Sequence, residues 1–95
     1  MYIKIHKARH GDVVAVCDED LLGKTLEEGK YHLRISEHFY KGEKKDVKFI
    51  EHILLGADNI NLIGKEAIAL GLKLKIITKE HSNVIAGVPH AQVYK

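Results

Sequence analysis

The chain has 95 residues, of which 45% are apolar and 29% charged, and its formal net charge is +2. This length suits a single core, and the composition excludes a disordered chain. The even balance of charge excludes a protein that coats nucleic acid with a strongly basic surface, while a local basic patch stays open. We therefore expect one domain over residues 1–95.

The N-terminal segment carries charged and imidazole side chains at Lys4, His6, Lys7 and Arg9, a pattern that argues against a signal peptide. No apolar run approaches the roughly 20 residues that a membrane span requires. We expect a cytoplasmic protein that does not associate with a membrane.

The first forty-five residues alternate between strand and loop patterns. Residues 2–7 alternate in polarity, a turn follows at 9–12, and the apolar run 13–17 completes a predicted β-hairpin. Residues 21–29 contain two glycines and predict a loop with one helical turn. Residues 30–36 alternate again and predict a half-buried strand, whereas 36–45 predict an exposed loop or bulged edge.

The second half of the chain shows helical periods. Asp46 is a suitable N-cap for a helix over about residues 47–57, and Asp58 or Asn59 for a second one that ends at Gly71. Strands are expected at 73–78 and, as a short final strand, at 84–85. Strands followed by grouped helices predict an α+β fold, with a mixed, mainly antiparallel sheet and two helices grouped on one face.

Several familiar sites are excluded or disfavoured by the residues themselves. Gly23-Lys24-Thr25 is similar to the end of a phosphate-binding loop, but Asp18 stands where that loop requires its first glycine. Cys17 is the only cysteine and lies in an apolar run, so we expect it to pack as a small hydrophobe. The acidic run 18–20 is more typical of a solvated turn than of a magnesium site.

Seven histidines are many for this length, yet their spacing does not match a zinc site. His6 and His32 are possible cross-strand neighbours on the exposed sheet face, where they could form an adventitious metal or anion site. We expect no metal and no cofactor.

Motifs along nearly the whole chain resemble the archaeal family called domain of unknown function 424. The resemblance lies in Val14-Ala15-Val16-Cys17-Asp18, Leu22-Gly23-Lys24-Thr25, Phe39-Tyr40, Asn61-Leu62-Ile63-Gly64 and Gly87-Val88-Pro89-His90-Ala91-Gln92. Ala86 stands where that pattern would have a second glycine. The resemblance implies a small, single-domain archaeal protein and carries no established reaction or ligand.

Three groups of side chains are candidates for binding. The segment 34–45 mixes aromatics with cations, as single-stranded RNA sites do; its candidate residues are Arg34, His38, Tyr40, Lys41, Lys44 and Lys45. His90 and Gln92 are expected on a rigid turn in the tail, where they either read a ligand or bond to nearby backbone. Asn59, Asn61 and Gly64 are expected to open the second helix, where backbone N–H groups suit an anion, although ordinary capping explains them as well.

The favoured hypothesis is a non-enzymatic module that binds RNA or a ribonucleoprotein through the 34–45 segment and the tail. An enzyme with a pocket centred on His90, helped by Asp18 or Asp20, is one alternative. A protein-interaction subunit or homodimer is another, formed through an exposed strand edge at 84–85 or 30–36.

Overall fold

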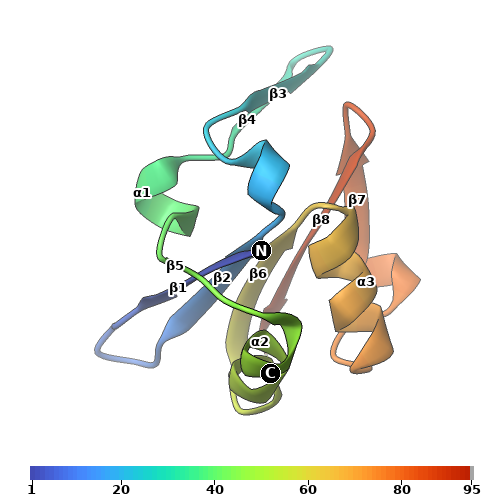
Figure 1. Ribbon diagram of the computed structural model, residues 1–95. Helices are drawn as coiled ribbons and strands as arrows, with labels where there is room; N and C mark the ends of the chain where they lie inside the picture. The colour runs from blue at the N-terminus through green and yellow to red at the C-terminus, as the bar shows by residue number, and fades with distance from the viewer. Residues whose placement is uncertain (95) are drawn as a thin grey trace.

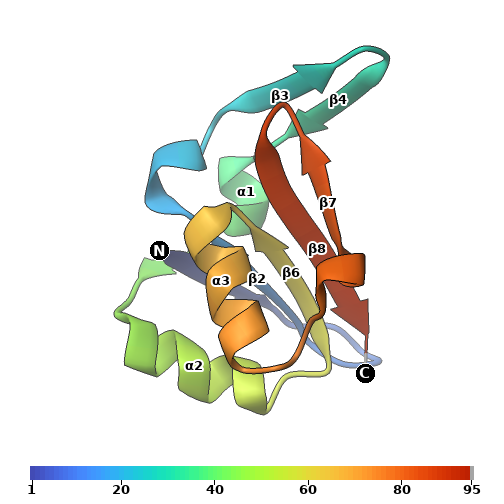
Figure 2. The same cartoon turned by 90° about the vertical axis from the view of Figure 1, so that its right-hand side faces the viewer.

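The computed structural model describes residues 1–94 and contains a six-stranded sheet, a two-stranded sheet and three α-helices (Figures 1 and 2). The large sheet has the strand order β5-β1-β2-β6-β8-β7. Its strands are β1 (Tyr2–His6), β2 (Val13–Cys17), β5 (Glu43–Lys44), β6 (Asn59–Ile63), β7 (Ser82–Ile85) and β8 (Val88–Tyr94). The small sheet is a hairpin of β3 (Thr25–Glu28) and β4 (Tyr31–Arg34).

The large sheet is mixed, as the sequence predicts, because one of its strand pairs is parallel. β2 and β6 run parallel from the pair Val13 and Asn59 to the pair Cys17 and Ile63. Every other pair in this sheet is antiparallel. The carboxyl ends of β2 and β6 therefore lie side by side at one end of the sheet.

Two helices cover one face of this sheet, which confirms the predicted α+β arrangement (Figure 2). They are α2 (Val47–Leu55) and α3 (Lys65–Lys73). Asp46 caps α2 as predicted, because its carboxylate accepts a hydrogen bond of 2.9 Å from the N–H of Phe49. Among residues 1–94, no helix is long and apolar enough to cross a membrane.

The opposite face is covered only in part. The short helix α1 (Glu37–Tyr40) and the β3–β4 hairpin pack near the end where β2 and β6 stop (Figure 1). They form a second, smaller apolar cluster with the sheet; its buried members are Cys17, Leu21, Leu26, Ile35 and Ile63.

The predicted start of the second helix is wrong, because residues 59–63 form the central strand β6. Ile60 and Leu62 are buried on the helix-covered side, while Asn59 and Asn61 alternate with them on the other side. This two-residue period is that of a strand. The residues from Ile60 onward that we assigned to one helix therefore belong to two elements, the strand β6 and the helix α3 that follows it.

The predicted strand at 73–78 is also absent from the described chain, since α3 continues to Lys73 and the chain then turns. Lys75 adopts a φ of 60°, and the N–H of Ile76 bonds to the Gly71 carbonyl at 3.1 Å. Gly71 is thus inside the helix rather than at its cap. A Cβ at Gly71 would overlap Leu62 of the sheet, so glycine lets α3 pack closely there.

The predicted loops at 21–29 and 36–45 both contain regular structure, since 25–28 form β3 and 37–44 include α1 and β5. The predicted strand at 30–36 does form as β4, but in the small sheet rather than the large one. His32 consequently lies 3.3 Å from Glu27 of its own hairpin, and β4 does not pair with β1. The proposed cross-strand pair of His6 and His32 is therefore wrong.

A buried carboxylate joins the parallel strands to α3. Asp18 follows β2, is 5% exposed, and accepts hydrogen bonds from the N–H groups of Glu66 (2.9 Å) and Ala67 (2.8 Å). It is not part of a solvated turn, unlike the exposed Glu19 and Asp20. Gly64, at φ 109°, lies against this carboxylate, and any Cβ there would overlap it. The side chain of Asp18 thus caps a helix whose bonded N–H groups lie 48 and 49 positions later in the chain.

We predict that Asp18→Ala lowers the free energy of unfolding by about 1–3 kcal/mol, because two N–H groups at the start of α3 lose their acceptor. Urea unfolding measures this change. Asp46→Ala is the matched control, since Asp46 caps the more exposed helix α2 and a smaller loss is expected there.

Gly64→Ala should destabilise the protein in its own right, but by less in the Asp18→Ala background, where the overlapping carboxylate is gone. Additive effects of the two substitutions would contradict the close approach of Asp18 to Gly64.

We predict that Cys17 resists modification in the folded protein. The thiol is buried and donates to the Asp18 carbonyl at 3.1 Å, and burial raises its pKa to about 12. At pH 8 only about one thiol in ten thousand would then be ionised. A chromogenic aromatic disulfide should react with the protein in urea and much more slowly without it; equal rates would contradict the burial.

Candidate functional site: the open face of the sheet

The face of the large sheet turned away from α2 and α3 carries rows of polar side chains. Strand register places Gln92 of β8 opposite Asn61 of β6, and His90 opposite Ile63. On the other side of β8, Asn83 of the edge strand β7 lies opposite His90. Amide and imidazole groups from three neighbouring strands are therefore brought together on one surface.

Helix α1 covers the other half of this face and forms a wall beside these rows. The Phe39 ring stacks on His6 of β1 with centroids 4.6 Å apart, and Nε2 of His6 lies 2.8 Å from the Phe39 carbonyl oxygen. Tyr40 packs edge-on against Phe39 and joins the smaller apolar cluster. Burial raises the pKa of Tyr40 to about 12, so its hydroxyl stays protonated at neutral pH.

Between this wall and β7 the face forms a hollow of about 350 Å³, called here the open-face hollow. It is lined by Leu33, Tyr40, Asn61, Leu62, Ile63, His81, Asn83, His90, Ala91 and Gln92. These lining residues include amides, imidazoles and one phenol, and none of them is Asp, Glu, Lys or Arg. The hollow therefore suits a ligand part that is uncharged and rich in hydrogen-bonding groups.

One side chain of this hollow, His90, has a ring nitrogen that lacks a hydrogen-bond partner within the described chain. Its Nε2 atom is buried and has no hydrogen-bond partner among residues 1–94. Buried polar atoms are nearly always paired, so such an atom calls for a partner from outside the chain, either water or a ligand.

The tail motif is not the rigid turn that the sequence predicts. Residues 88–92 belong to strand β8, and the turn before it is made by Ala86 and Gly87, with φ values of 51° and 79°. His90 and Gln92 are separated by one residue and share a face because side chains alternate along a strand.

The cations predicted between residues 34 and 45 are dispersed and mostly paired. Arg34 lies on β4, His38 on α1 and Lys44 on β5, whereas Lys41 and Lys45 directly follow α1 and β5. Lys44 contacts Glu19 at 2.5 Å, Lys45 contacts Glu43 at 2.9 Å, and Lys41 lies 3.9 Å from Glu37. Arg34 and His38 are exposed, and of the predicted set Tyr40 lines the hollow.

The predicted anion site at a helix start is wrong. Asn59 and Asn61 lie in strand β6, so only Gly64 of the three stands at the start of α3. The carboxylate of Asp18 already occupies that helix terminus. A second anion there would meet this negative charge.

Sequence reasoning missed Leu33, His81 and Asn83, and it assigned Asn61 to the wrong kind of site. The alternation in Asn59-Ile60-Asn61-Leu62 could have identified a strand with one polar face. The positions of Leu33 and His81 had no such signal, because they depend on how the hairpin and β7 pack. Within residues 1–94, no group of three or more His, Cys, Asp or Glu is placed to hold a metal ion.

Comparison with known proteins agrees with this fold. The chain is similar to the crystal structure of an uncharacterized conserved protein from Methanopyrus kandleri, with a TM-score of 0.81 and 30% sequence identity. The match covers 98% of this chain and 89% of that one. A comparison with curated proteins finds no match.

A family model described as a protein of unknown function, DUF424, matches residues 5–95, nearly the whole length of the chain. The chain belongs to this DUF424 family, as its sequence motifs suggest.

Proposed function

We propose that this protein is a cytoplasmic, non-enzymatic module that binds RNA or a ribonucleoprotein, and that the open-face hollow holds an unpaired base. The observation that carries this proposal is the buried, unpartnered Nε2 of His90 in a hollow lined by uncharged polar groups.

The chemistry of the hollow favours a base over a phosphate. Bases of single-stranded RNA are recognised on their edges by hydrogen-bonding side chains and on their faces by aromatic rings. Asn61, Gln92 and Asn83 offer both donors and acceptors, and Tyr40 supplies the aromatic side chain. A phosphate would instead require cations, which this lining lacks.

Phosphate contacts must then come from the rim and should be few. Lys41 directly follows Tyr40 and is the most loosely paired of the three lysines, at 3.9 Å from Glu37. About one or two phosphates neutralised in this way correspond to a slope near −1 in a plot of log affinity against log salt. Binding that depends weakly on salt would support base recognition as its main source.

The enzymatic alternative needs a carboxylate beside His90. Both oxygens of Asp18 are engaged by α3, and no acidic residue lines the hollow within the described chain. The observed geometry therefore favours binding over general acid–base chemistry at this site.

Self-association is a second candidate, supported by the edge strand β7. This strand pairs with β8 on one side, and its Val84 is 57% exposed. Open edges with exposed apolar side chains can pair with another chain. Sedimentation at two protein concentrations tests this candidate, and a mass that stays monomeric at both would exclude it.

The binding test uses labelled single-stranded RNA of mixed sequence, and in parallel ribosomal subunits, at about 50 and 200 mM salt. His90→Ala should weaken binding at least tenfold, because the base loses a buried partner. His52→Ala is the matched control, since His52 is exposed on α2 at the opposite face.

A double variant separates the hollow from the basic segment. Lys44→Ala with Lys45→Ala should change affinity little, because both lysines are paired with carboxylates outside the hollow. Strong loss in this double variant, with none in His90→Ala, would show that the basic segment is the binding surface. Absence of binding to either RNA sample at both salt concentrations would refute the proposal.

A further inference from the structure

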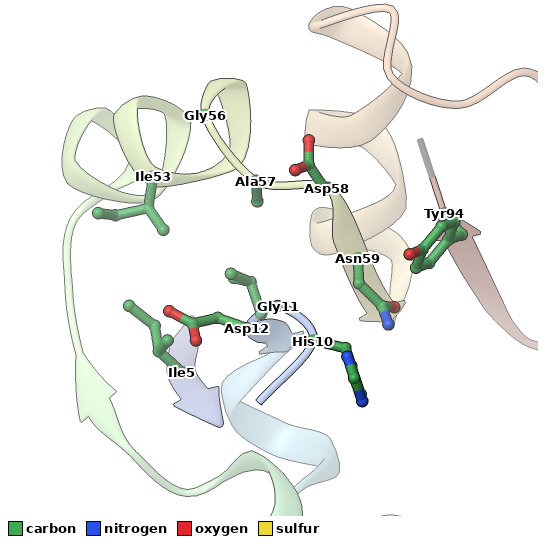
Figure 3. A pocket seen from close by; sticks show the side chains of 11 residues that line it. Ile5, His10, Gly11, Asp12, Ile53, Gly56, Ala57, Asp58, Asn59 and Tyr94 are labelled. Carbon is green, nitrogen blue, oxygen red and sulfur yellow. The ribbon is translucent and has the colours of Figure 1, made fainter. Parts of the chain in front are cut away.

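A second cavity lies at the other end of the large sheet, and it shares no lining residue with the open-face hollow (Figure 3). Its volume is about 360 Å³. It opens between the turn that joins β1 to β2 and the C-terminal end of α2. The lining residues are Ile5, His10, Gly11, Asp12, Val14, Ile53, Gly56, Ala57, Asp58, Asn59 and Tyr94.

The two sides of this cavity differ in chemistry. In Figure 3, Asp12 lies next to Ile5 and below Ile53 on one side, whereas Asn59 and Tyr94 lie on the other. The cavity is thus lined by both apolar side chains and oxygen-bearing groups. A ligand that fits this arrangement has an aliphatic part as well as hydrogen-bond donors.

The charges of the lining favour a cation. Asp12 and Asp58 contribute carboxylates, and none of the lining residues among 1–94 is Lys or Arg. The C-terminal end of α2, at Gly56, adds the negative end of a helix dipole. Lys7 contacts Asp12 at 2.9 Å, and this hydrogen bond lowers the pKa of Asp12, which keeps that carboxylate ionised at neutral pH.

Asn59 supplies an observation independent of these charges. Its Oδ1 atom is buried and lacks a hydrogen-bond partner within the described residues 1–94. An amide oxygen only accepts hydrogen bonds, so the group that would satisfy it must donate one. An ammonium group is a compact cation with three donors and no acceptor.

A divalent metal fits less well than an organic cation. Residues 1–94 contain no group of three His, Cys, Asp or Glu placed to hold an ion, and Asp12 is already paired with Lys7. Magnesium and calcium also draw no benefit from the apolar side chains in this lining.

We propose that this cavity binds a small aliphatic amine, with its ammonium group at Asn59, within the electrostatic field of the Asp58 carboxylate, and its carbon chain across the apolar side. This site is separate from the proposed RNA-binding surface and does not depend on it.

The test is isothermal titration of the whole protein with putrescine, a linear aliphatic diamine, at pH 8 and about 20 mM salt, where charge screening is weak. Asp58→Asn and Asn59→Leu should each lower the association constant at least fivefold. Asp20→Asn is the matched control, because Asp20 is an exposed carboxylate that does not line this cavity. Lys7→Ala should tighten binding, since it frees Asp12 from its present partner.

Thermal unfolding of each variant shows whether it is folded, and chemical shifts of the Asn59 side-chain amide report directly on the site. Amide shifts that follow the putrescine titration support the proposal. It is overturned if putrescine at millimolar concentration gives neither heat nor shifts, if both cavity variants bind like the parent protein, or if Mg²⁺ binds in preference to the amine.

Discussion

The buried carboxylate of Asp18 is the constraint on which most of this structure depends. It stands at the carboxyl end of β2 and must find hydrogen-bond donors, because an unpaired buried charge is very costly. The donors are the first N–H groups of α3, so the chain has to turn from β6 into a helix directly beside β2. Gly64 makes this turn possible, since a side chain there would occupy the space of the carboxylate.

The same junction positions the candidate site. The N–H of Gly64 bonds to the carbonyl of Pro89 at 2.8 Å, which links the turn to the start of β8. β8 then pairs with β6 so that His90 and Gln92 lie on the face opposite the helices. A structural feature on one side of the sheet therefore determines which side chains are presented on the other.

The two cavities differ in the chemistry that they offer. The polar groups of the open-face hollow are amides, imidazoles and a phenol, whereas the cavity beside α2 is lined by two carboxylates and four aliphatic side chains. Each contains one buried polar atom without a partner in residues 1–94, Nε2 of His90 and Oδ1 of Asn59. These contrasting linings support different ligand classes, which is why we propose an uncharged base for one and an amine for the other.

The sequence by itself determined the local features of this protein. The alternation of residues 2–7, the apolar run 13–17 and the Asp46 cap predicted a hairpin and a helix that the structure confirms, because short-range periods and caps act within a few residues. His90, Gln92 and Tyr40 were identified as candidates from residue type alone. Their chemistry could be read from the sequence, but their neighbours could not.

Only the tertiary structure decided how these pieces combine. The period of residues 59–70 fitted one helix as well as a strand and a shorter helix, and pairing with β2 selected the second arrangement. Lys44 looked free in the sequence, but Glu19, 25 positions away, contacts it after folding. Contacts over such separations depend on sheet order and packing, and no local pattern encodes them.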